Sequence, residues 1–273
     1  MTRHRPSQYH YSFRLLLPFL RVLQGKPSVL SRDAELLLCG ADPAPCVLNA
    51  QNIPSDSSFL VVFNHYDRPG LGAWWGIAPF VVAIASHRTR EPRQVHVMLA
   101  REWYIPNGFD HQVKQPLTRW FFGKFAKTYD CIGLPPALDL PEFRGQGATA
   151  IRRALALTHA NPPELLAVSP EGNTGNDLGL CHPPHGAGLM LLLLAYETIP
   201  FLPVGIFQDE NERVHVNFGK PFTLNMPQHL SKEERDRQAT HRAMVSIGRL
   251  LPERMQGVYR QDIQAELVSG IAQ

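Results

Sequence analysis

The sequence has few cysteines and no cysteine pair. Four are scattered over 273 residues, and none belongs to a Cys-x-x-Cys motif: Cys39, Cys46, Cys131 and Cys181. A disulfide scaffold needs a higher cysteine content, and a structural zinc site needs ligands clustered in the chain. We therefore exclude both classes, expect no bound metal, and predict four reduced thiols that serve as small apolar residues, as in a cytoplasmic protein.

The apolar run near the N-terminus is short. It covers 15–20, far less than the about 20 residues that a membrane-spanning helix needs. Arg21 closes the run, and no small-residue cleavage site follows it. Neither a spanning helix nor a cleaved signal peptide is therefore expected there.

Acidic residues are absent from this same segment, 1–26. Its basic residues are Arg3, Arg5, Arg14, Arg21 and Lys26. Such a segment is typical of an amphipathic helix on an anionic membrane surface, where each cation contributes up to about 1 kcal/mol. The alternative is a helix that packs on its own domain. The net charge of the whole chain, +3, is too small to indicate a nucleic-acid partner.

No stretch in the middle of the chain has the composition of a linker, and no repeat is present. We expect an N-terminal amphipathic helical segment at 1–44, a main domain at 45–225 and a helical extension of that domain at 226–273. The predicted strands are 58–63, 94–99, 165–168, 201–207 and 214–218, with a short stretch at 129–134. The predicted helices are 71–85, 113–127, 147–159, 187–196 and 231–254. This alternation predicts an α/β fold with a mixed, largely parallel sheet flanked by helices.

Two polar residues lie within three positions after predicted strands. His65 comes after 58–63, and Glu171 comes after 165–168. Active sites of α/β sheets gather at the carboxyl ends of strands. A histidine there suits a general base, although a lone histidine at a strand end is more often structural.

The residues around these two positions resemble a known family. The matching blocks, in order, are Asn-Ile-Pro at 52–54, Phe-Leu-Val-Val-Phe-Asn-His at 59–65, Ser-Pro-Glu-Gly-Asn-Thr at 169–174, Gly-Ala-Gly at 186–188, Ile-Pro-Phe-Leu-Pro-Val-Gly-Ile at 199–206 and Phe-Gly-Lys-Pro-Phe at 218–222. Together they resemble the glycerolipid acyltransferases that acylate glycerol-3-phosphate and lysophosphatidic acid.

The resemblance implies an activity and roles for individual residues. It implies transfer of a fatty acyl group from acyl-CoA or an acyl-carrier protein to a hydroxyl of a lysophospholipid or glycerol-phosphate-like acceptor, with no metal or redox cofactor. His65 would be the base. Glu171 would shape the acceptor site, with Gly172 at a positive φ; alternatively, Glu171 only caps its turn.

The chain departs from the family pattern at two places. Gly70 stands where the family has an aspartate five residues after its histidine, so Asp67 is our candidate partner for the imidazole. No arginine lies in 129–136, where the family binds the acceptor phosphate. The candidates to replace it are Arg68, Arg144, Arg152 and Arg153.

Two further expectations remain open. Trp74 and Trp75 line an acyl tunnel or belong to the core. The chain is a peripheral enzyme on the cytoplasmic, inner face of the membrane, or a non-catalytic lipid-binding relative. A serine hydrolase is excluded, because no Gly-x-Ser-x-Gly motif exists.

Overall fold

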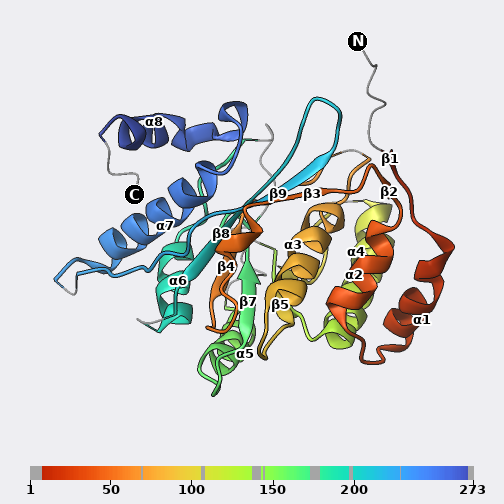
Figure 1. The fold of residues 1–273 in the computed structure, drawn as a ribbon. Coiled ribbons are helices and arrows are strands. Elements are labelled where there is room, and N and C mark those ends of the chain that lie inside the picture. The colour runs from red at the N-terminus through yellow and green to blue at the C-terminus, as the bar shows by residue number, and fades with distance from the viewer. Residues whose placement is uncertain are drawn as a thin grey trace, which may run out of the picture.

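In the computed structural model, the described part of the chain forms two sheets and eight α-helices (Figure 1). The model describes 8–68, 70–105, 108–136, 143, 145–172, 179–196, 199–227 and 229–269. A small antiparallel sheet pairs β1 (Gln8–Tyr9) with β2 (Ala41–Asp42).

The main sheet has seven strands in the order β3-β9-β8-β4-β7-β5-β6. All neighbouring strands are parallel except the antiparallel pair β8–β9. The strands are β3 (Cys46–Leu48), β4 (Leu60–Phe63), β5 (Val95–Ala100), β6 (Ile132–Leu134), β7 (Leu165–Val168), β8 (Phe201–Gln208) and β9 (Val214–Phe218). The predicted fold class, a mixed and largely parallel sheet, is confirmed.

Helices cover both faces of this sheet (Figure 1). They are α1 (Leu16–Gln24), α2 (Leu30–Leu38), α3 (Trp74–His87), α4 (Phe109–Tyr129), α5 (Ala148–Thr158), α6 (Ala187–Ala195), α7 (Lys232–Gly248) and α8 (Arg260–Val268). Short 3-10 helices lie at Phe13–Leu15, Ala50–Asn52, Glu253–Met255 and Gly257–Tyr259. On one side α3 packs on the sheet, α2 packs on α3, and α1 packs on α4. On the other side α5 and α7 contact the strands, and α6 packs between them.

The central strands are buried along their whole length. Every residue of β4 and β7 is buried, and β4 lies between β7 and β8. Strands covered on both faces read as continuous apolar runs, and this is the pattern from which 58–63 and 165–168 were predicted.

Several boundaries differ from the prediction. The helix predicted over 231–254 ends at Gly248, and Pro252 precedes a separate 3-10 helix. β3 and α8 were not predicted, because three residues are too few to show a period and α8 is mostly polar. Within the N-terminal segment, helices cover Phe13–Leu15, Leu16–Gln24 and Leu30–Leu38.

Candidate functional site

A cavity of about 210 Å³ lies at the carboxyl ends of β4, β5 and β7. It is the place that the fold class predicts for an active site. Its described polar lining residues are Asn64, His65, Tyr66, Asp67 and Ser169. Its apolar wall includes Phe63, Trp74, Ile77, Met98, Leu99, Trp103, Phe122, Leu134, Val168 and Ile206, with Gly72 and Gly172 at the backbone.

Asn64 fixes the end of β4. Its side chain is 2% exposed, its Nδ2 donates to the Ile206 carbonyl at 2.9 Å, and its Oδ1 accepts from the Ile206 N–H at 2.7 Å. Both polar atoms of the Asn64 side-chain amide thus bond the backbone of β8, and this fixes the position of the residue before His65. Sequence analysis had not assigned this role, although Asn64 belongs to the block that carries the resemblance.

Glu171 holds the His65 backbone. Its carboxylate is 3% exposed; Oε2 accepts from the His65 N–H at 3.0 Å, and Oε1 accepts from the Cys181 N–H at 2.9 Å. The Cys181 thiol also donates to Oε1 at 3.4 Å. Burial and the Glu171 carboxylate raise the pKa of that thiol to about 11, so it keeps its proton. Cys181 carried no signal in the sequence.

Burial controls the protonation of both central residues. It raises the pKa of Glu171, and the N–H groups of Cys181 and His65 offset only part of that rise. Burial lowers the pKa of the His65 imidazole, and the Asp67 carboxylate nearby raises it in part. The imidazole is therefore neutral near pH 7 and able to accept a proton.

Asp67 enters the cavity because the chain turns back just after it. Arg68 and Leu71 form a bridge with two backbone hydrogen bonds of 3.1 and 2.8 Å. Gly70 within this turn has φ +86°, and Gly172 has φ +70°, the positive value expected for it. Asp67 and His65 thus line the same cavity.

The arginines proposed for a phosphate lie elsewhere. Arg68 forms an ion pair with Glu212 at 3.4 Å. Arg152 donates to the hydroxyl of Thr149 on the exposed face of α5, and Arg153 pairs with Asp130. None of the three lines the cavity. Arg144 lies outside the described residues.

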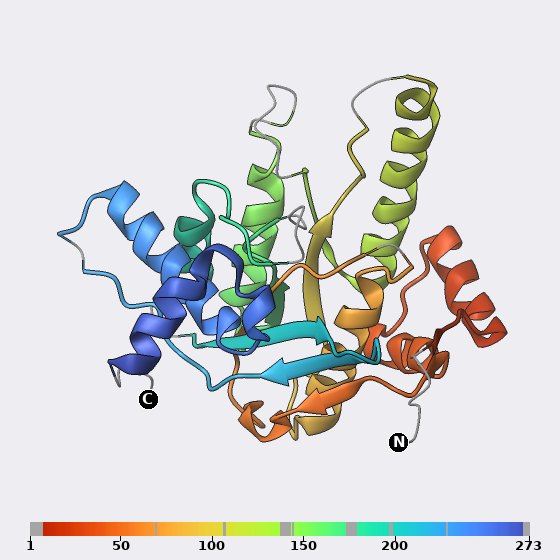
Figure 2. The same ribbon diagram turned by 90° about the horizontal axis from the view of Figure 1, so that it is seen from above.

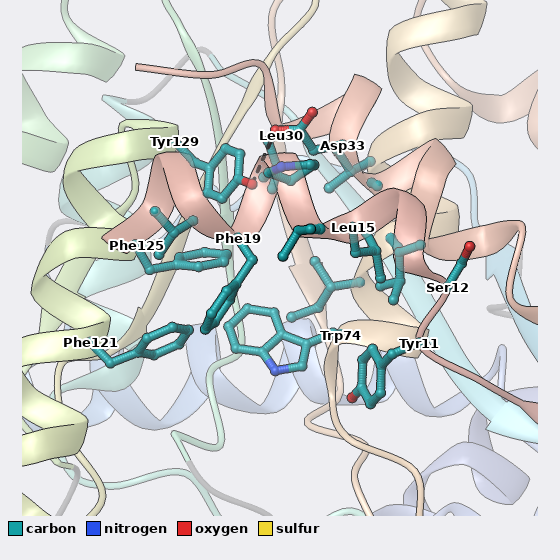
Figure 3. A pocket seen from close by; sticks show the side chains of 18 of the residues that line it. Tyr11, Ser12, Leu15, Phe19, Leu30, Asp33, Trp74, Phe121, Phe125 and Tyr129 are labelled. Carbon is teal, nitrogen blue, oxygen red and sulfur yellow. Dashed lines mark hydrogen bonds between the residues drawn. The ribbon is translucent and has the colours of Figure 1, made fainter. Parts of the chain in front are cut away.

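A second, larger chamber adjoins this cavity. It has a volume of about 550 Å³, and its walls come from the N-terminal helices, α3 and α4. The side chains of Phe19, Phe121, Phe125 and Trp74 gather around it, while Tyr129 donates to Asp33 at 3.1 Å at one end (Figure 3).

Trp74 and Ile77 belong to the walls of both spaces. Trp74 stacks obliquely on Phe125, with ring centroids 4.8 Å apart. Trp75, in contrast, is 1% exposed and is a core residue beside Tyr9. Trp75 thus belongs to the core, whereas Trp74 lines both spaces.

Ser169 is a further cavity residue that sequence analysis did not assign. Its Oγ is buried and has no hydrogen-bond partner among the described residues. It directly follows β7 and precedes Pro170, and it lines the cavity with His65. An unpaired buried hydroxyl costs stability, so such a group calls for an explanation.

Within the described residues, no helix is long and apolar enough to cross a membrane, and no cluster of His, Cys, Asp or Glu has the composition of a metal site. The four cysteines are free thiols.

No protein-family model and no curated protein matches this chain. Among solved structures, the chain is similar to the 1-acyl-sn-glycerophosphate (LPA) acyltransferase PlsC from Thermotoga maritima. The two sequences are 16% identical, the match covers 84% of this chain and 76% of that chain, and the TM-score is 0.42. A likeness this distant carries no inference about chemistry, which must come from the site itself.

Proposed function

We propose that this chain is a peripheral membrane acyltransferase. It transfers a fatty acyl group from acyl-CoA or an acyl-carrier protein to a hydroxyl of a lysophospholipid or glycerol-phosphate-like acceptor. The anionic inner face of the cytoplasmic membrane supplies the lipid.

One observation carries the proposal. A neutral, half-buried histidine and a carboxylate line a small cavity that shares a wall, Trp74 and Ile77, with a large apolar chamber. The chamber volume of about 550 Å³ falls within the range of roughly 300–1,000 Å³ that is usual for ligand sites. A base beside a space for an apolar chain is the arrangement that acyl transfer to a hydroxyl requires.

His65 starts the proposed reaction. Its imidazole takes the proton of the acceptor hydroxyl as that oxygen attacks the thioester carbonyl carbon. A C–O bond forms, and the carbonyl π electrons move to the oxygen. When the tetrahedral intermediate collapses, the C–S bond breaks, and the leaving thiolate takes the proton from the His65 imidazolium. The Asp67 charge stabilises that imidazolium.

Glu171 has a positioning role in this scheme. Because its two oxygens are used by backbone N–H groups, it holds the His65 loop, whereas the family resemblance gives it a role toward the acceptor. The acceptor's negative group needs a cation, and two described arginines directly follow cavity residues: Arg68 follows Asp67, and Arg101 follows Ala100. Arg68 is paired with Glu212, so Arg101 is our candidate. Its guanidinium contacts Glu102 at 3.3 Å, and it also bonds Gln146.

A non-catalytic lipid-binding protein is the second candidate. It is favoured by the cavity itself, because none of the described residues that line it is a lysine or arginine. Such a protein would keep the apolar chamber and lose turnover.

A thiol-release assay separates the two candidates. Purified chain is incubated with acyl-CoA or acyl-carrier-protein thioester, with and without glycerol-3-phosphate or a lysophospholipid. We expect thiol release that depends on a hydroxyl acceptor, together with an ester product. Binding of a fluorescent fatty acid without thiol release from either donor would support the lipid-binding protein instead.

A further inference from the structure

Helix α4 exposes a row of apolar side chains. Val113, Leu117 and Trp120 are 47%, 58% and 48% exposed. Their spacing of four and three residues places them on one face of the helix. Single exposed apolar residues are ordinary, but a row of this kind marks a contact surface.

A second exposed row lies on the neighbouring N-terminal helices. Phe13, Leu16 and Leu17 are 87%, 62% and 59% exposed. The two rows belong to helices that pack together, since the rings of Phe19 and Phe121 lie 6.4 Å apart. Figure 2 shows α1 and α4 on the same side of the molecule.

The exposed row on α4 leads toward the end of α1. Lys124 continues it by a further helical step, and the side chain of Lys124 lies against Gly25, which ends α1. We name the exposed residues Phe13, Leu16, Leu17, Val113, Leu117 and Trp120 of these adjoining elements the α1–α4 face.

The charge of this face is positive. Between residues 8 and 26 the charged residues are Arg14, Arg21 and Lys26, without an acid. α4 adds three lysines, Lys114, Lys124 and Lys127, against one acid, Asp110, while its Arg119 is paired with the buried Glu102. The face also meets the apolar chamber, because Phe13 and Leu16 are both exposed and part of its wall.

We propose that the α1–α4 face docks on an anionic lipid bilayer, with α4 as a second contact beside the N-terminal helices. Apolar and aromatic side chains among cations match the interface region of such a bilayer. A chain that leaves the bilayer would reach the chamber beside Phe13 and Leu16. This inference rests on the proposed function, since a lipid substrate is what such docking serves.

Vesicle sedimentation tests the contribution of α4. The double variant Leu117→Asp/Trp120→Asp is compared with the matched control Leu267→Asp/Val268→Asp, which adds the same charge to exposed apolar positions of α8. With phosphatidylglycerol-containing vesicles we expect the α4 variant to bind at least about tenfold more weakly than the wild type, and the control within about twofold. Added salt and pure phosphatidylcholine vesicles should each weaken wild-type binding.

Two results would overturn the inference. One is equal vesicle binding by the α4 variant and the wild type. The other is a wild-type dimer in gel filtration that the α4 variant loses without any change in vesicle binding, because the occupant would then be a second copy of the chain.

A soluble assay keeps this test separate from the proposed function. Leu117 and Trp120 line neither the cavity nor the chamber, so the α4 variant should turn over a water-soluble short-chain thioester at the wild-type rate. A wild type that binds vesicles but releases no thiol contradicts the proposed function alone. A wild type that releases thiol and binds no vesicles contradicts the docking alone.

Discussion

At the scale of single residues, the chemistry depends on how two opposing effects set the protonation of His65. Burial lowers the pKa of the imidazole, and the Asp67 carboxylate raises it, with burial the larger effect. A lowered pKa favours the neutral form in the folded protein. His65 therefore remains a base at pH values where an exposed histidine is partly charged.

The pH dependence of turnover follows from this balance. We expect the acid limb of kcat/KM to have its midpoint below 6.5, because activity is lost only when the imidazole becomes protonated. Asp67→Asn removes the charge that raises the pKa, so it should move this midpoint to still lower pH. It should also lower kcat by at least about 10²-fold and leave the acceptor KM nearly unchanged. The exposed carboxylate variant Glu210→Gln serves as the control, and a midpoint that Asp67→Asn leaves in place would contradict the pairing.

Glu171 gives a second prediction, on stability. Glu171→Ala leaves the N–H groups of His65 and Cys181 without their acceptor, and each unpaired donor costs about 1–3 kcal/mol. Glu171→Gln keeps one accepting oxygen and should cost less. Urea unfolding measures both, with the half-buried Glu164→Ala as control. An unchanged free energy of unfolding with a raised acceptor KM would indicate that Glu171 acts on the acceptor instead.

The site residues were predictable where they lie at strand ends, as His65 and Glu171 do, or share one loop. His65 and Asp67 share one loop, so their common cavity follows from the strand end and the turn at Gly70. Arg68 lies beside them in sequence, but its partner Glu212 comes from the β8–β9 turn, far along the chain. A contact of that range is set by tertiary structure and leaves no local pattern.

At the scale of elements, close helix packing depends on a glycine in α6. A Cβ at Gly188 would lie 2.1 Å from the Asp236 carbonyl oxygen of α7 and 2.7 Å from the Thr240 hydroxyl. Asp236 also accepts from the N–H groups of Gly186 and Leu189. Helix α6 thus sits directly against α7.

A pair of glycine variants tests this packing. Gly188→Ala should lower the free energy of unfolding by at least about 1–3 kcal/mol, because the helices must separate. Gly123→Ala, within α4, meets no atom within 4 Å and should raise that free energy by about 0.5–1 kcal/mol. Thermal unfolding measures both. Equal effects of the two substitutions would contradict the close crossing of α6 and α7.

The order of elements was largely predictable from apolar patterning. β7 and β9 have the predicted bounds, because each is a buried run closed by polar or turn residues. Helix boundaries were predicted less well where the pattern is polar. Helix α4 runs from Phe109 to Tyr129, beyond both ends of the predicted 113–127. Its apolar row faces outward. Apolar residues that face outward repeat with the period of a helix, but they do not mark the side of the helix that packs on the core.

At the scale of the whole molecule, the cavity adjoins the chamber, and the chamber adjoins the α1–α4 face. The cavity lies at the carboxyl ends of the central strands, and Trp74 and Ile77 separate it from the chamber. The chamber in turn is bounded by the exposed N-terminal helices. In the account proposed for this chain, a lipid passes from the bilayer along this path to His65.

The most direct test of that account is the thioester turnover of His65→Ala. The substitution removes the base and leaves the Glu171 hydrogen bond, which is made by the His65 backbone N–H. We expect acceptor-dependent thiol release to fall by at least about 10²-fold. The unfolding midpoint should change little, since the imidazole is only half-buried in the cavity wall. Turnover within a factor of about three of the wild type would contradict the account, because a general base contributes far more than that.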